Sequence, residues 1–178
     1  HRTITSVIGS GLVANRQNCS ASPIAALERH DQCGELGEAT GAIALLRPLI
    51  DAGLVSADTP VCLPSVSGYS GGGRSMIEAY EAGTAPAFEL YGLSLEHKHV
   101  PELQKYGNLD QRPIFVPSVG NFRQGMLVSV PLHLDALNGK PKAADLEAVL
   151  VERYRNAELV RVVSSQDLSV KAGRIEPE

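Results

Sequence analysis

The eight residues Ser67–Arg74, SGYSGGGR, constrain the fold of this chain more than any other segment. Glycine reaches backbone angles that other residues avoid, and it lets a ligand approach the main chain closely. Successive backbone N–H groups can surround an anion, and Arg74 adds a planar set of donors that fits phosphate or carboxylate. The segment therefore indicates a cradle for an anionic group. A flexible glycine turn ahead of a helix is the alternative interpretation.

Composition narrows the class of protein. The chain has 178 residues, enough for one well-buried domain, and 43% of them are hydrophobic. No apolar run approaches the roughly 18 residues of a membrane helix, and the first residues lack the basic start and apolar core of a secretory signal. The net charge of −4 and a pI near 5.7 give no general reason to expect nucleic-acid binding. We therefore expect neither membrane nor nucleic acid as a partner.

The chain has three cysteines, Cys19, Cys33 and Cys62. An odd number without metal-ligand spacing argues against a disulfide framework or a zinc cluster. This usage fits a reducing cytoplasm, where one of the thiols can be reactive.

Hydrophobic spacing predicts alternating helices and short strands. We expect helices over 40–54, 74–80 and 142–156, and extended segments over 61–66, 88–95, 114–119, 126–134 and 159–163. Pro48 should kink or end the first helix. Several connections are too short for a crossover helix. An α+β fold with a mixed, largely antiparallel sheet is therefore predicted.

The first 36 residues differ from the rest of the chain. Residues 6–14, SVIGSGLVA, superficially fit a dinucleotide-binding fingerprint, but no βαβ unit of the required length follows. We therefore expect a divergent N-terminal arm over 1–36 and one domain over 37–178.

Two further segments contain residues suited to chemistry. In an extended HKHVPE segment, His97 and His99 would share one face and could supply a general acid or base. A surface strand with a structural histidine is the alternative, and on these residues alone it is slightly favoured. No third ligand lies at a suitable spacing, so no metal site is expected. In the segment PSVGNFRQGM, Asn121 and Arg123 lie between glycines and could bind a substrate carboxylate or phosphate. An ordinary hairpin loop is the alternative.

Taken together and in this order, TGAIALLRPLIDAGL, SGYSGGGR, YGLSLEHKHVPEL and PIFVPSVGNFRQGMLVSVPLHL resemble one family. That family is N-acetyl-γ-glutamyl-phosphate reductase, in the second of its two sequence types, and the resemblance covers about residues 37–177. Its relatives include aspartate-semialdehyde dehydrogenase and, more distantly, glyceraldehyde-3-phosphate dehydrogenase. The resemblance implies their C-terminal catalytic domain, with helices on one face of the sheet, and a homo-oligomer.

The resemblance also implies a reaction of arginine biosynthesis, in which NADPH reduces an acyl phosphate to a semialdehyde and phosphate is released. A cysteine thiolate would form a thioester, and hydride transfer would follow. His99 would be the acid/base residue, with His97 close by, and Asn121 and Arg123 would bind substrate. The implied cofactor-side residues, binding NADP, are Ser67, Gly68, Ser70, Gly71, Gly72 and Arg74.

The sequence departs from this family at the nucleophile. The family carries Asn-Pro-Gly-Cys ahead of the first helix, and its cysteine position falls on Gly37 here. Cys33, four residues earlier, is the thiol that we predict as nucleophile, with the absence of a working nucleophile as the alternative. We expect the family's dinucleotide-binding domain to be largely missing here, and NADPH affinity to be weak as a result. A non-catalytic module for dimerisation or anionic-metabolite binding, and a hydrolytic Cys-His enzyme, are the rival functions.

Overall fold

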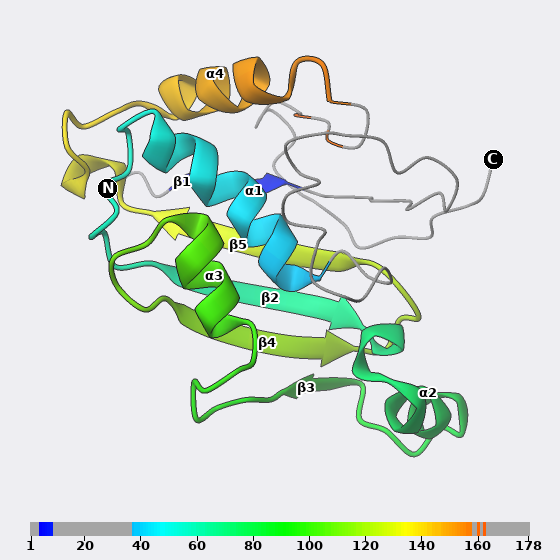
Figure 1. Ribbon diagram of the computed structural model, residues 1–178. Coiled ribbons are helices and arrows are strands. Elements are labelled where there is room, and N and C mark those ends of the chain that lie inside the picture. Colours follow the sequence, from blue (N-terminus) through cyan, green and yellow to red (C-terminus); the bar gives the residue numbers. More distant parts are fainter. Residues whose placement is uncertain (1–3, 9–36, 158–159, 161, 163–178) are drawn as a thin grey trace.

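The computed structural model describes residues 4–8, 37–157, 160 and 162, and its centre is a five-stranded sheet (Figure 1). The strands follow the order β1-β5-β2-β4-β3. Their bounds are Ile4–Ile8 (β1), Cys62–Gly68 (β2), Phe88–Leu90 (β3), Ile114–Gly120 (β4) and Met126–Leu132 (β5). Only β2 and β4 pair in parallel, whereas the other three pairs are antiparallel. This confirms the predicted mixed, largely antiparallel sheet.

Helices α1 and α3 lie over the same face of this sheet, and α4 packs against α1 (Figure 1). The short helix α2 lies beyond the ends of β2 and β4. The helix bounds are Glu38–Asp51 (α1), Arg74–Glu81 (α2), Val100–Gly107 (α3) and Ala143–Tyr154 (α4), and single 3₁₀ turns span Tyr69–Gly72 (η2) and Leu134–Ala136 (η3). This arrangement, with α1 and α3 on one face of the sheet, confirms the predicted α+β class.

Pro48 lies inside α1 without ending the helix. Proline has no N–H, so the carbonyl of Ala44, four residues earlier, loses its usual helical donor. The Tyr154 hydroxyl donates to this carbonyl at 2.8 Å, which ties α4 to α1. The residue that should disturb the first helix therefore creates an acceptor for the last one.

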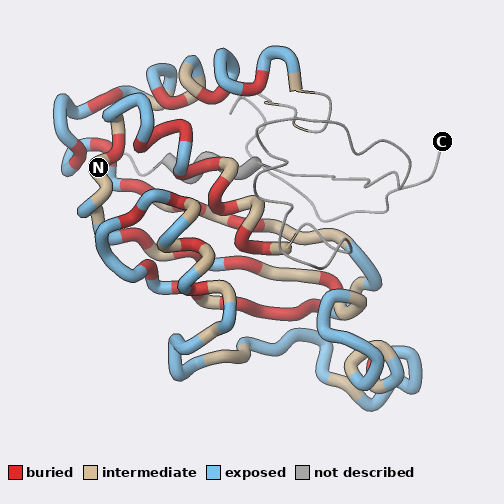
Figure 2. The backbone as a smooth tube through the Cα atoms, viewed as in Figure 1, coloured by how far each residue is buried: buried red, intermediate tan, exposed pale blue. Residues whose placement is uncertain are grey.

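The core lies between α1 and the sheet. Figure 2 shows buried residues along α1, β2, β4 and β5, whereas β3 and α2 are largely exposed. The fully buried side chains include Leu46 of α1, Leu63 of β2, Leu103 of α3 and Phe115 of β4. This packing holds the beginnings of α1 and α3 in fixed positions over the sheet.

Two predicted segments differ from the structure. The extended segment expected over 88–95 ends at Leu90, because Gly92 and Leu95 have φ angles of +62° and +61° and turn the chain. The extended HKHVPE segment is also wrong, since His97 and His99 lie in a turn and α3 begins at Val100. Most of the strand expected over 159–163 lies outside the described residues.

Candidate active site

The beginning of α1 faces the beginning of α3 at Gly37 and His99. Gly37 is the N-cap residue of α1, and His99 is the N-cap residue of α3. A Cβ atom on Gly37 would lie 3.7 Å from His99 Nε2 and 3.8 Å from its Cε1. Position 37 is therefore the point on α1 from which a side chain would meet the His99 ring.

Glu102 orients the His99 ring. His99 Nδ1 lies 2.9 Å from Glu102 Oε2, and both groups are partly buried. A carboxylate only accepts hydrogen bonds, so Nδ1 carries the proton and donates it. In the neutral ring Nε2 is then an acceptor, and it is this atom that faces position 37. The arrangement is that of a general base held by a carboxylate.

His97 lies behind His99 and contacts aromatic rings. Its ring centroid lies 5.0 Å from that of His99, 5.1 Å from Phe115 and 5.8 Å from Tyr91. Burial lowers the pKa of His97 below its usual 6.5, and the neighbouring charges of His99 and Lys98 lower it further. Its Nδ1 accepts the His99 backbone N–H at 3.3 Å, which requires an unprotonated Nδ1. These contacts suit a residue that supports His99.

Glu38 places a buried carboxyl group in the same cluster. Its side chain is only 5% exposed, and the Ser65 hydroxyl donates to Oε1 at 2.9 Å. Burial raises the pKa of Glu38 above 4.5, while the Ser65 hydrogen bond, the charge of His99 and a hydrogen bond from Ser67 lower it in part. Burial also raises the pKa of Tyr91 to about 12, with the negative charge of Glu38 contributing. The carboxyl group is thus coupled to His99 and Tyr91.

The glycine segment packs by its backbone against the loop after β4. The N–H groups of Gly68, Tyr69 and Ser70 donate to the carbonyls of Gly125, Phe122 and Arg123 at 2.9, 3.0 and 3.0 Å. A Cβ on Gly68 would lie 2.8 Å from the Arg123 backbone. Glycine is required at position 68 for this close approach. These three N–H groups are therefore not free to bind an anion in the described structure.

The predicted arginines lie on the surface around α2. Arg74 Nε lies 3.5 Å from Glu78, and the Arg74 side chain is 93% exposed. Arg123 Nη1 lies 3.3 Å from Glu81, also at an exposed site. The Asn121 backbone N–H donates to the Ala87 carbonyl, and Asn121 is exposed. The described structure therefore brings His97 and His99 together, and leaves the arginines in a separate, solvated group.

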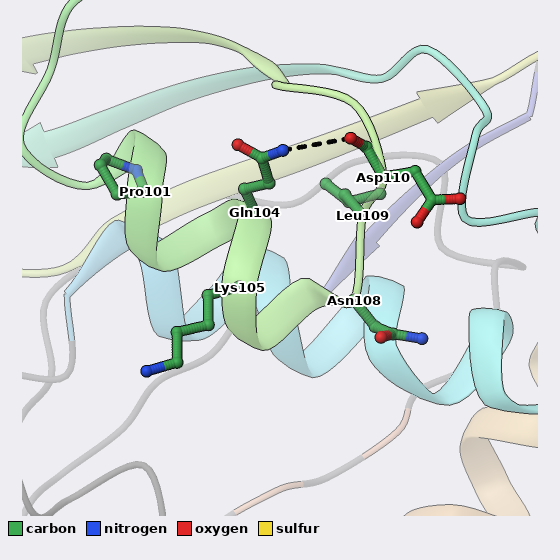
Figure 3. Close-up of a pocket in the computed structure, with 6 residues that line it drawn as sticks. All are labelled: Pro101, Gln104, Lys105, Asn108, Leu109 and Asp110. Carbon is green, nitrogen blue, oxygen red and sulfur yellow. Dashed lines mark hydrogen bonds between the residues drawn. The ribbon is translucent and has the colours of Figure 1, made fainter.

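A shallow hollow of about 320 Å³ lies along α3 and the residues just after it, from Pro101 to Asp110 (Figure 3). The Gln104 amide reaches the Asp110 carbonyl at 3.2 Å, and the Lys105 and Asn108 side chains point away from it. This surface offers no acid/base pair, so the beginning of α1 remains the better candidate site.

Three other expectations concern absences or undescribed residues. Cys33 and Cys19 lie outside the described residues, and Cys62 of β2 is a half-buried free thiol. Within residues 37–157 no group of three or more His, Cys, Asp or Glu is arranged to hold a metal ion. None of the described helices is long and apolar enough to cross a membrane.

Glu38 and Glu102 were not predicted as site residues. Each is an acidic residue in the first turn of its helix, a position that the helix dipole favours by itself. The spacing of Glu102, three residues after His99, is compatible with contact on one helical turn. No pattern indicates that Glu38 is buried.

The fold is an α+β domain of the class to which the dimerisation domains of semialdehyde dehydrogenases belong. The sequence profile described as "Semialdehyde dehydrogenase, dimerisation domain" matches residues 38–174, and the chain belongs to this family.

Its similar relatives carry the name that the resemblance predicted. The N-acetyl-γ-glutamyl-phosphate reductases of Brucella ovis and Brucella canis are each 53% identical to this chain over 144 residues, which is 78% of this chain and 46% of the relative. The chain therefore spans about half the length of these curated relatives.

Proposed function

We propose that this chain supplies the catalytic and dimerisation half of an N-acetyl-γ-glutamyl-phosphate reductase. The enzyme would reduce N-acetylglutamyl 5-phosphate to the 5-semialdehyde and release phosphate, as a step of arginine biosynthesis in the cytoplasm. The observation that carries this proposal is the placement of His99 Nε2 at 3.7 Å from a Cβ on Gly37, at the beginning of α1. The identity with reductases over 78% of the chain supports the substrate class.

His99 would act as the general acid and base in this reaction. Its Nε2 can take a proton from the attacking group and return one to the oxygen of the product, while Glu102 stabilises the imidazolium formed in between. NADPH, when bound, supplies the hydride. The glycine segment Ser67–Arg74 would lie on the NADPH side of the site, with Asn121 and Arg123 on the substrate side. We retain Cys33 as the proposed thiol, which requires the chain before Gly37 to bring it to His99.

Reconstitution tests this function. The 178-residue chain would be mixed with, or fused to, the N-terminal half of a Brucella relative, and NADPH consumption would be followed with N-acetylglutamyl 5-phosphate. We expect activity that Cys33→Ser abolishes and His99→Asn reduces at least about 100-fold. A folded, active-site-intact hybrid without NADPH consumption would contradict the enzymatic function. Faster alkylation of Cys33 than of Cys62 would support the thiol assignment.

A non-catalytic dimerisation module is the second candidate function. Gly37 favours it, because the position that faces His99 carries no nucleophile. The sheet face opposite α1 and α3 supports association in either case: Ile114 of β4 is 49% exposed, and Phe88 and Leu90 of β3 are 55% and 51% exposed. We expect Ile114→Glu to lower the apparent mass in solution, while Glu89→Gln, an exposed control, leaves it unchanged.

A further inference from the structure

The loop from β3 to α3, which carries both histidines, turns through a conformation that leucine disfavours. Leu95 has a φ angle of +61°, in the left-handed region, and its N–H donates to the Gly92 carbonyl at 2.9 Å. Among the described non-glycine residues with positive φ angles, which are Leu95, Asn108 and Lys140, it is the one apolar side chain. A bulky residue is rare in this region, and such strain persists only where surrounding contacts hold it. Leu95 is 38% exposed, so burial of its side chain is not what holds the turn.

Arg112 supplies the contacts that hold this turn. Its Nη2 donates to the Leu95 carbonyl, and its Nη1 lies 2.8 Å from Glu96 Oε1. One planar guanidinium group thus binds two consecutive residues of the loop. The ion pair with Glu96 is exposed and by itself contributes little. The bond to the carbonyl has a different effect, because it fixes the peptide group that follows Leu95.

Arg112 is attached to a rigid part of the fold. The next residue, Pro113, is buried and has a fixed φ angle, and β4 begins directly after it. Phe115 of β4 is fully buried, and its ring centroid lies 5.1 Å from that of His97 and 6.5 Å from that of His99. The beginning of β4 therefore contacts the loop twice, at the strained turn through Arg112 and at the two histidines through Phe115.

The turn in turn packs against His97. A Cβ on Gly92 would lie 3.7 Å from His97 Cδ2 and 3.4 Å from Pro117 Cγ, so the loop backbone lies directly beside the imidazole. His97 Nδ1 then accepts the backbone N–H of His99 at 3.3 Å. A shift of the turn would therefore reach His99 through the chain and through His97.

We propose that Arg112 is a positioning residue for His99. It holds the strained turn at Leu95, and the turn keeps His97 against Phe115 and the His99 ring toward position 37. Arg112 acts through the loop and takes no part in the chemistry. Its effect on catalysis rests on the proposed function, whereas its effect on the histidines can be measured without any reaction.

Nuclear Overhauser contacts in the 178-residue chain test this positioning directly. In the parent protein we expect contacts between the His97 and Phe115 rings, and between His99 Hε1 and the α-protons of Gly37. Arg112→Met keeps an aliphatic stem but no donor, and it should lose the contact between His99 and Gly37. Arg47→Met is the matched control. Arg47 pairs with Asp51 at 2.7 Å on the exposed side of α1, and its replacement should leave the histidine contacts unchanged.

Leu95→Asn separates the strained turn from other roles of Arg112. Asparagine adopts the left-handed region readily, so the turn should form without the arginine. Leu95→Asn alone should match the parent, and Arg112→Met/Leu95→Asn should regain the contact that Arg112→Met loses. Thermal unfolding is measured for each variant. Loss of the fold in Arg112→Met that Leu95→Asn restores would support the proposal in the same way, and loss of the fold in both would contradict it.

Kinetics of the reconstituted enzyme give the second readout. Arg112→Met should lower kcat by about tenfold or more and leave KM unchanged, because a misplaced acid/base residue slows the chemistry without removing a substrate contact. Leu95→Asn should restore kcat in the double variant. A parent hybrid without activity would reject the proposed function, and the histidine contacts would still decide the role of Arg112.

Two results would overturn the proposal. Unchanged histidine contacts in Arg112→Met would reduce Arg112 to a surface ion pair. Contacts that stay lost in Arg112→Met/Leu95→Asn would show that the strain at Leu95 is not what Arg112 holds.

Discussion

The cluster at the beginning of α1 and the glycine segment with α2 are built in opposite ways. In the first, Glu38 and His99 are held by side-chain hydrogen bonds on elements that pack against the core. In the second, backbone hydrogen bonds fix Gly68 to Ser70, and Arg74 and Arg123 pair with glutamates of α2 in solvent.

The two regions therefore use polar residues in different ways. A buried, coupled carboxyl group is costly and marks a site, since its pKa depends on its surroundings. An exposed ion pair contributes little and is easily replaced. Substitutions in the first region should therefore change its acid–base chemistry. Substitutions in the second region should disturb its backbone packing.

Gly37→Cys gives the largest expected effect. A thiol at position 37 would lie at the positive end of α1 and next to His99, which lowers thiol pKa values and increases the thiolate fraction. We expect alkylation by iodoacetamide to be roughly tenfold or more faster than that of Cys62. The measurement is mass-spectrometric labelling at neutral pH.

The matched control is Asp51→Cys, at the exposed opposite end of the same helix. Its thiol should label more slowly than the one at position 37. In the double variant Gly37→Cys/His99→Asn the advantage should be largely lost. Equal labelling of both helix ends would show that the cluster does not activate a group at position 37.

Gly68→Ala tests the second region. The added Cβ would lie 2.8 Å from the Arg123 backbone, so one of the two segments must shift. We expect the free energy of unfolding to fall by about 1–3 kcal/mol, the usual cost of overpacking, in urea titrations. Gly37→Ala places its Cβ at an ordinary 3.7 Å from His99 and should change stability by less than about 0.5 kcal/mol. Similar losses in the free energy of unfolding for Gly68→Ala and Gly37→Ala would show that the two regions do not differ in backbone packing.

Glu38→Gln tests the buried carboxyl group through pH. Because burial raises the pKa of Glu38, the folded protein binds this proton more tightly than the unfolded chain does. Stability is therefore lost as the pH rises from about 4.5, the unfolded value, through the higher folded value, and the penalty persists above it.

Glutamine cannot ionise and can still accept the Ser65 hydrogen bond. We expect Glu38→Gln to unfold at a higher temperature than the parent at neutral pH, and the gain to disappear below pH 4.5. Glu89→Gln, at an exposed site, should show no such trend. A gain that does not vary with pH would mean that ionisation of Glu38 is not its source.

Arg74→Ala should have the smallest effect on stability. Its ion pair with Glu78 is 3.5 Å long, and both side chains are exposed. We expect a change below about 0.5 kcal/mol in the free energy of unfolding. A loss above 1 kcal/mol would show that α2 depends on this arginine in a way that the ion pair does not explain.

Much of the fold follows from local sequence patterns. Ile43, Leu46, Leu49 and Ile50 share one face of α1 and are buried, as their spacing predicts. Helix α3 was missed because HKHVPE has few apolar residues and contains Pro101. That proline fits the first turn of a helix, and Asn108 ends α3 in a left-handed conformation.

The site was predictable only in part. The order of motifs singles out His99, but its partner Glu102 and the buried Glu38 depend on how α1 and α3 meet, which is a tertiary property. The glycine segment shows the opposite case, because a local pattern suggests a function there and the structure gives a packing reason. Its composition indicates an anion cradle, whereas Gly68 is needed for contact with the Arg123 backbone. Composition does not show whether a glycine makes room for a ligand or for a neighbouring backbone segment.

The orientation of the His99 ring is the central claim of this account, and its tautomer tests that claim most directly. Nitrogen-15 NMR of the imidazole groups, at a pH where the rings are neutral, distinguishes protonated from unprotonated ring nitrogens. We predict that His99 carries its proton on Nδ1 and that Glu102→Gln weakens this preference, while exposed His133 is unaffected. A His99 ring protonated on Nε2 in the parent protein would contradict the account, because Nε2 would then have no lone pair to accept a proton at position 37.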